Sequence, residues 1–324
     1  MPTTPLPPDY HRRPAHLEDA ASLADLLTAV DAAEGLEEVL GPEGARRELS
    51  YPGLDLERDT LVAVTPDGNI RGFAFLWLHP TGHPTRAILW MEAHPGHLPL
   101  EPFLMDWAEA RARQGLEQAL PAARRLRQHV EEHRARRRRA IEEAGYLHAR
   151  TFVEMWRRID QDLPAEPSPS PGVEIVPWAP SLVEGARLAA NESFALHWDS
   201  LPLEPEEWQQ RVCADPFFRP DLSRLAVSGG KVVALCLASV DAEQNARRGV
   251  AEVWVERVGT ILSHQRHGLA SALVGEVLRA AADAGFTRAG LGVDQESTSN
   301  ATALYERLGF AATRRTLAYA KDLG

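Results

Sequence analysis

The sequence predicts an α/β protein made of two domains that share one fold. Three observations lead to this prediction. The two halves of the 324-residue chain echo each other at a shift of about 164 residues. A stretch rich in proline and serine, 161–172, separates the halves. In the second half, strand-like alternation at 251–258 gives way to a glycine-containing loop and then to an amphipathic helical pattern.

The repeated segments set the expected limits of the domains. Residues 88–92 (ILWME) match 252–256 (EVWVE), and 144–146 (AGY) match 308–310 (LGF). A repeat of this length indicates two domains of one fold and not a solenoid of short units. The expected parts of the chain are a first domain, a linker and a second domain, at 1–160, 161–172 and 173–324.

Each half begins with a hairpin signal. In the first half, apolar runs at 61–64 and 73–76 flank a turn that contains Gly68. In the second half, runs at 225–227 and 232–240 flank two consecutive glycines. Both hairpins precede the strand that carries the repeated tryptophan, so the order of elements is the same in the two halves.

The most informative segment is the loop between the strand at 251–258 and the helix predicted at 271–284. Its Gly268 lets a ligand approach the backbone closely. The first N–H groups of the following helix, with the positive end of its dipole, then face that ligand. We interpret the loop as a diphosphate-binding site. The alternative is that the glycine serves only the dihedral angles of the turn.

A second segment strengthens this interpretation. Residues 289–293 predict a strand, and the short helix after it ends at Gly309. Together the two segments resemble the acetyl-CoA-binding core of the GNAT superfamily of N-acetyltransferases. The loop pattern of that family and its Asn and Leu-Tyr-x-x-Leu-Gly-Phe signature are matched by Gln265, Gly268, Ala270, Asn300, Leu304, Tyr305, Leu308, Gly309 and Phe310.

The resemblance implies a fold and a co-substrate. Each domain should contain a mixed, mostly antiparallel, twisted sheet flanked by helices. The strands at 252–258 and 289–293 should splay apart, with the pantetheine arm of acetyl-CoA in the gap and no metal involved. Backbone N–H groups near residues 258–260 should stabilise the oxyanion. The implied cofactor-binding residues are Val258, Gly259, Thr260, Gln265, Arg266, His267, Gly268, Leu269, Ala270, Ser271 and Asn300.

The resemblance also places the general acid at Tyr305, which would protonate the leaving thiolate. The alternative is an ordinary tyrosine on an amphipathic helix. For the base, Glu256 is the first choice and Glu252 the second, because both lie on one face of the strand. They could also be plain surface glutamates, and Glu92, the counterpart of Glu256 in the first half, favours that alternative.

In this fold the acceptor pocket is formed by the stretch 191–221, which is rich in aromatic and acidic residues. Such groups suit a cationic amine. The predicted substrate-binding residues are His197, Trp198 and Asp199. Simple packing of a helix against a loop is the alternative.

The first half lacks the cofactor chemistry. Depending on the register chosen, Gly268 corresponds to Leu104 or Leu98, and Tyr305 corresponds to Ile141. We therefore expect a degenerate first copy that is structural or that shapes the substrate entrance.

Composition excludes several classes. The balance of 44% hydrophobic and 25% charged residues is that of a soluble globular protein, and a net charge of −11 argues against a nucleic-acid partner. Eight arginines at 124–139 are interpreted as a solvated helix face, with an anion patch as the alternative. No segment has the pattern of a signal peptide or a membrane span, so we expect a cytoplasmic protein without a membrane partner. Cys236 should be a buried thiol.

The predicted function is acetyl-CoA-dependent transfer of an acetyl group to the primary amine of a small molecule, by direct attack in the second domain. The tandem arrangement also resembles that of mycothiol synthase, which acetylates the cysteinyl amine of a thiol conjugate. Protein N-terminal acetylation and a non-catalytic acyl-CoA sensor are further alternatives. A homodimer is compatible with the sequence.

Overall fold

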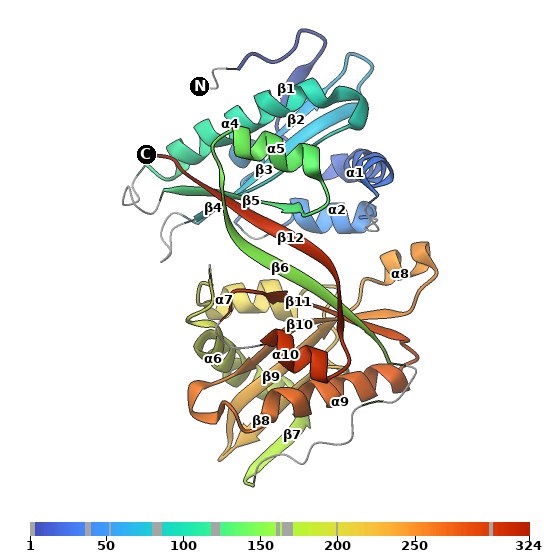
Figure 1. Cartoon of the computed structure of the whole chain (residues 1–324), viewed down its shortest axis with the longest axis vertical. Coiled ribbons are helices and arrows are strands. Elements are labelled where there is room, and N and C mark those ends of the chain that lie inside the picture. Colours follow the sequence, from blue (N-terminus) through green and yellow to red (C-terminus); the bar gives the residue numbers. More distant parts are fainter. Residues whose placement is uncertain are drawn as a thin grey trace. The chain divides into compact units, whose positions relative to one another are not determined.

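Two compact units make up the computed structural model of the chain (Figure 1). The first comprises Met1–Ala149 together with Leu317–Gly324, and the second comprises Arg150–Thr316. The structure describes residues 4–35, 40–51, 53–79, 86–117, 124–159, 163, 171–198, 200–297 and 301–324.

The first unit is a mixed sheet with helices on both faces. Its elements are β1 (His11–Arg13), α1 (Ala20–Glu34), α2 (Pro42–Leu49), α3 (Leu56–Asp59), β2 (Thr60–Val64), β3 (Ile70–His79), β4 (Arg86–Ala93), α4 (Glu101–Gly115), β5 (Arg125–Glu131) and α5 (Ala135–Glu143). The strands follow the order β1-β2-β3-β4-β5, antiparallel except for the parallel pair β4–β5. Helices α1 and α2 pack on one face, and α4 and α5 pack on the other.

The second unit repeats this plan. Its elements are β7 (Val173–Pro177), α6 (Val183–Phe194), α7 (Pro205–Trp208), β8 (Arg224–Ser228), β9 (Lys231–Ser239), α8 (Ala242–Arg248), β10 (Glu252–Thr260), α9 (Leu269–Asp283), β11 (Arg288–Asp294) and α10 (Ala301–Arg307). The strands follow the order β7-β8-β9-β10-β11, antiparallel except for the parallel pair β10–β11. Helix α9 runs along β8, β9 and β10 (Figure 1), and α6 covers the opposite face. The predicted fold class, two tandem mixed sheets flanked by helices, is confirmed.

The last strand of each half crosses the division between the units. The second unit begins within β6 (Leu147–Arg158), which pairs antiparallel with β11 from Arg158↔Arg288 to Phe152↔Asp294. The second unit ends within β12 (Ala311–Asp322), and the part of this strand from Leu317 onward belongs to the first unit. There Tyr319 donates a hydrogen bond to Glu142 over 2.7 Å. The predicted repeat therefore refers to the order of helices and strands along the chain. The predicted linker, 161–172, lies outside the described residues apart from 163, 171 and 172.

The sequence signals account for the helix that positions the site. The predicted apolar stripe of α9, which includes Leu273, Val277 and Leu278, is fully buried. The helix ends where Gly285 adopts φ +87°, a left-handed conformation that favours glycine. Cys236 on β9 is fully buried as predicted. Across the described parts of the chain, no helix combines the length and apolar character that a membrane crossing needs.

Candidate functional site

A cavity of about 760 Å³ lies in the second unit, at the size typical of small-molecule sites. It is bounded by α6, the ends of β10 and β11, the loop before α9, and α10. Its lining residues are Phe152, Ser193, Phe194, His197, Val255, Glu256, Val258, Gly259, Thr260, His264, Gln265, Arg266, Gly268, Leu269, Ala270, Ser271, Leu291, Gly292, Val293, Asp294, Ser297, Ala301, Leu304, Tyr305 and Arg307.

The cavity opens where two parallel strands part. Strands β10 and β11 pair only from Glu252↔Arg288 to Val255↔Leu291, although β10 continues to Thr260. On its other side β10 stays paired with β9 as far as Thr260, so only the edge toward β11 is released. The predicted splay of these strands is confirmed, and it leaves backbone groups of β10 facing the cavity.

The glycine loop presents a helix N-terminus to the cavity. Gly268 is the N-cap of α9 with φ +76°, and no side chain caps the helix. The N–H groups of Leu269, Ala270 and Ser271 precede the first intrahelical bond, from Ala272 N to Gly268 O (3.0 Å). Such bare amides at the positive end of the helix dipole bind anions.

Arg266 shows that the loop is held in an unusual conformation. Its φ is +62°, and among the described residues it is the one non-glycine residue with positive φ. A left-handed conformation costs an L-residue roughly 1–2 kcal/mol, and such strain gathers at ligand-binding sites. The side chain of Gln265, next to it, donates a hydrogen bond to Thr260 O (3.1 Å), which fastens the loop to the end of β10.

The end of β10 is shaped by a close approach to α6. A Cβ atom at Gly259 would lie 2.9 Å from Cβ of Ser193 and 3.1 Å from the Phe194 ring. Only glycine therefore lets β10 and α6 pack together beside the cavity. The hydroxyl of Thr260 is buried without a hydrogen-bond partner among the described residues. A buried polar atom of this kind usually has a partner, so it fits a ligand group in the gap.

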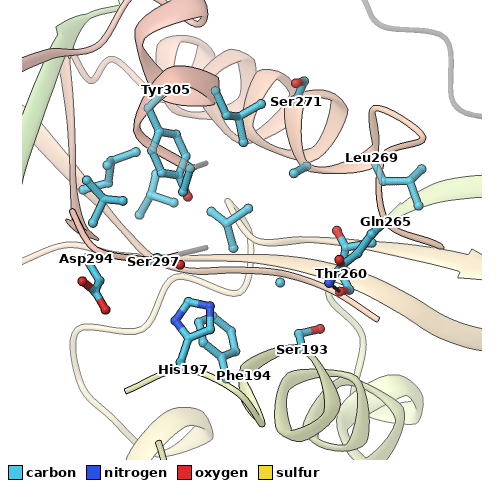
Figure 2. Close-up of a pocket in the computed structure, with 18 of the residues that line it drawn as sticks. Ser193, Phe194, His197, Thr260, Gln265, Leu269, Ser271, Asp294, Ser297 and Tyr305 are labelled. Atoms are coloured by element: carbon cyan, nitrogen blue, oxygen red, sulfur yellow. Dashed lines mark hydrogen bonds between the residues drawn. The ribbon is translucent and has the colours of Figure 1, made fainter. Parts of the chain in front are cut away.

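Tyr305 projects from α10 into the cavity (Figure 2). The residue is 7% exposed. Burial raises the pKa of its phenol well above the ordinary value of about 10, and the nearby Cys236 thiol acts in the same direction. The hydroxyl is therefore protonated at neutral pH, which a proton donor requires.

The two predicted base candidates have different surroundings. Glu256 lines the cavity and is the extra residue of a β-bulge, since Val255 pairs with Ala238 and Arg257 with Leu237. Bulges often re-aim a side chain next to a functional site. Ser239 donates a hydrogen bond to Glu256 over 2.7 Å.

Glu252 does not line the cavity. It is buried, and its oxygens accept hydrogen bonds from Arg248 (2.8 Å) and Arg288 (2.6 Å). These contacts indicate a structural role for Glu252 at the end of β10 that pairs with β11. Glu256 is therefore the base candidate that lines the cavity.

The predicted substrate residues are only partly brought together. His197 lines the cavity, and burial lowers its pKa while the Asp294 charge acts against that change. Trp198 does not line the cavity, and its ring lies 6.0 Å from that of Phe152. Asp199 lies outside the described residues.

Two predicted cofactor-binding residues are also not found at the cavity. His267 is exposed and does not line it, and Asn300 lies outside the described residues.

Phe152 and Asp294 are among the lining residues that were not predicted from the sequence. Phe152 belongs to β6, which precedes the linker, so the limit drawn at 160 assigned it to the other domain. Asp294 ends β11, where a carboxylate directly before a turn is an ordinary cap signal. A carboxylate at the carboxyl end of a splayed strand is the signal that could have identified Asp294.

The first unit has a smaller cavity of about 340 Å³ between the counterpart elements: α1, the end of β4 and the turn before α5. Ion pairs surround this cavity. Arg134 is buried and donates to both oxygens of Glu92 (2.8 Å each) and to Glu34 (3.0 Å). Arg136 donates to both oxygens of Glu101, at 2.7 and 2.9 Å.

The interpretation of the arginine-rich segment as a solvated face is therefore wrong for part of it. Arg127, Arg134 and Arg137 are buried. Charged groups are buried when they are paired. Besides the nearby Glu131, Arg134 pairs with Glu34 of α1 and Glu92 of β4, which are far away in sequence.

The sequence profile of the acetyltransferase (GNAT) family matches residues 189–310, the part of the second unit that carries the cavity. Residues 189–310 therefore match the GNAT family of acetyltransferases, and the chain as a whole has two tandem folds of the kind seen in GNAT structures. This confirms the resemblance that the motifs indicated.

Two curated relatives are mycothiol acetyltransferases. That of Catenulispora acidiphila is 32% identical over 167 residues, which are 50% of this chain and 51% of the relative. That of Streptomyces scabiei is 32% identical over 174 residues, 53% of this chain and 54% of the relative. The matched region thus spans about half the length of these relatives.

Two solved structures match almost the whole chain. A GCN5-related N-acetyltransferase from Sphaerobacter thermophilus is 26% identical with a TM-score of 0.77, over 98% of this chain and 97% of that one. A tandem GNAT protein from the clavulanic acid biosynthesis pathway is 16% identical with a TM-score of 0.70, over 97% and 99%. The second likeness concerns the fold alone.

Proposed function

We propose that the chain is an acetyl-CoA-dependent N-acetyltransferase that acetylates a primary amine of a small molecule in its second unit. One observation carries the proposal: a single cavity connects the bare N-terminus of α9, the released edge of β10 and the buried phenol of Tyr305. Each of these three features would contact a different portion of acetyl-CoA. The match of residues 189–310 to an acetyltransferase family supports it.

The residues fit acetyl-CoA in order along the cavity. The amides of Leu269, Ala270 and Ser271 would hold the diphosphate, with Arg266 beside them on the loop. The released backbone groups of β10 would pair with the amides of the pantetheine arm. The cavity residues Val258, Gly259 and Thr260 would then lie beside the acetyl group, which the co-substrate supplies as a reactive thioester.

Transfer requires stabilisation of charge at the carbonyl oxygen and movement of protons. Backbone N–H groups near Gly259 would donate to that oxygen while the amine nitrogen forms its bond to the carbonyl carbon and the carbon–sulfur bond breaks. Tyr305 would give its proton to the leaving thiolate, whose ordinary pKa is roughly 8.5 in a cysteine-like thiol. Glu256 would accept a proton from the attacking amine, directly or through water.

Two measurements on the wild-type protein test this function. Calorimetric titration should show binding of acetyl-CoA, and thiol release should rise above background with at least one member of a panel of primary amines. Binding without amine-dependent thiol release would identify an acyl-CoA sensor. Absence of binding would refute the assignment of the loop.

A further inference from the structure

Asp294 marks the end of the cavity that lies away from the glycine loop. It is the last residue of β11, and its side chain is 9% exposed. Figure 2 shows its carboxylate across the cavity from Gln265 and Leu269, with His197 on the same side. One of its oxygens accepts the N–H of Glu296 (3.0 Å).

Among the described residues, the guanidinium that pairs with this carboxylate is that of Arg150. Its Nε lies 4.0 Å from Oδ2 of Asp294, too far for a hydrogen bond. The Arg150 guanidinium also lies over the Trp198 ring, 5.9 Å from its centroid. Glu296 adds a second carboxylate that interacts with Asp294. Burial and the neighbouring Glu296 carboxylate raise the pKa of Asp294, and a cation bound beside these two carboxylates would offset their repulsion.

The basic and acidic side chains that line the cavity lie at different places along it. The cationic side chain of Arg266 and the imidazole of His264 belong to the loop at the diphosphate end. The remaining lining arginine, Arg307, is exposed at the end of α10. Asp294 and Glu256 are the lining carboxylates, and Ser239 already donates to Glu256.

Strand β6 holds this end of the cavity in place. Phe152 pairs with Asp294 across the sheet, Gln295 N donates to Thr151 O (3.0 Å), and Thr151 N donates to Glu296 (3.0 Å). Phe152 itself lines the cavity. An aromatic ring beside a carboxylate is a favourable environment for an ammonium group.

We propose that Asp294 recognises the ammonium group of the acceptor and that the nearby Arg150 guanidinium weakens its negative field. This rests on the proposed N-acetyltransferase function and extends it by naming the recognition residue. Binding of a primary ammonium ion restores the missing positive charge, whereas a neutral isostere of the same shape does not. Asp294 should therefore control the ratio of the affinities for an ammonium compound and for its neutral isostere.

The experiment compares matched pairs of an amine and its alcohol isostere: butylamine and butanol, phenethylamine and 2-phenylethanol, cysteamine and 2-mercaptoethanol. Ligand-observed NMR titrations give the affinity of each compound for the wild-type protein, with and without CoA. We expect the ammonium member of at least one pair to bind about 10-fold more tightly. A wild type with no such preference overturns the proposal.

Four variants locate the preference. In Asp294→Asn it should fall to within about twofold, and in Glu256→Gln it should persist. In Arg150→Gln it should grow, because the competing cation is gone. Persistence in Asp294→Asn, loss in Glu256→Gln or a decrease in Arg150→Gln contradicts the proposal, the last because it would show a merely structural contact. Asp294→Glu, which keeps the charge, should restore part of the preference.

Failure of this inference is distinguishable from failure of the proposed function. Acetyl-CoA binding, measured by calorimetry, depends on the loop at Gly268 and should be the same in wild type and Asp294→Asn. Thermal melting followed by circular dichroism verifies that each variant is folded. A wild type that binds no acetyl-CoA refutes the function, whereas an unchanged ammonium preference in Asp294→Asn refutes only the role of Asp294.

Discussion

Helices α9 and α4 occupy corresponding positions in the two units, but their N-termini have opposite environments. Helix α9 starts after Gly268 in the left-handed conformation, and its first amides face a cavity of about 760 Å³. Helix α4 starts after Leu100, carries Glu101 in its first turn and has Pro102, which lacks an N–H, as the next residue. The counterpart cavity measures about 340 Å³.

The difference teaches how one unit can keep the fold while losing the site. Glu101 is buried and places a carboxylate at the positive end of α4, where Arg136 and Arg137 pair with it. An internal anion therefore takes the position that a phosphate takes on a bare helix end. Further ion pairs, such as Arg134 with Glu92, fix the surrounding elements. In the first unit internal charge satisfies the polar groups that a ligand would satisfy in the second.

The largest expected effect tests the catalytic side of this comparison. Tyr305→Phe should lower kcat by roughly 10²-fold or more, because the leaving thiolate loses its proton donor. Acetyl-CoA affinity should stay near normal, since the ring still packs in the core. Steady-state thiol release and calorimetry measure the two quantities. Tyr319→Phe is the matched control: it removes a hydroxyl that donates to Glu142 in the first unit and should leave kcat unchanged. Full activity of Tyr305→Phe would remove this residue from the mechanism.

The second prediction concerns the ion pairs of the first unit. Glu92→Gln leaves the Arg134 guanidinium buried with less compensation, and breaking such a pair costs about 3–5 kcal/mol. Chemical denaturation should show this loss. The variant should retain acetyl-CoA binding if it remains folded, because the binding loop belongs to the second unit. A loss of unfolding free energy below about 0.5 kcal/mol would show that the Glu92–Arg134 pair does not stabilise the first unit.

The third prediction tests the loop with two glycines of one helix. Gly268→Val should weaken acetyl-CoA binding by about 10-fold or more, because the added side chain occupies open space in front of the bare amides and strains φ +76°. Gly285→Val is strained in the same way at φ +87°, at the other end of α9 and outside the cavity lining. Calorimetry should show a normal dissociation constant for the second variant. Equal affinities in both would refute the assignment of the loop.

The smallest effect is a pH dependence of stability in the first unit. Burial tends to raise the pKa of Glu34, but its hydrogen bond to Arg134 and the charges of Arg134 and Arg136 lower it below the ordinary value. A depressed pKa in the folded state contributes stability above the unfolded value of about 4.3, and this contribution is lost as the pH falls through the folded pKa. Calorimetric melts between pH 7 and pH 3 should show a smaller acid-dependent drop in Tm for Glu34→Gln than for wild type. Identical curves would contradict the prediction.

The sequence predicted more of the cavity near the glycine loop than of its opposite end near Asp294. Gly268 and Tyr305 lie in short segments whose strand, loop and helix signals are local, and both line the cavity. Glu252 was predicted from alternation along one strand, but its oxygens are taken by Arg248 and Arg288. Alternation specifies a face of the sheet and does not specify which neighbour occupies it.

The amino-acid sequence by itself determined the two copies of one fold, the glycine loop and the absence of that loop from the first copy, because these follow from short-range periodicity and from conformations that only glycine adopts freely. The tertiary structure decided that β6 pairs with β11, that Phe152 therefore lines the cavity, and that Asp294 lines it too. It also decided that Arg134 is buried against Glu92. Partners separated by many residues are chosen by the packing of whole sheets and helices, and no local pattern encodes that choice.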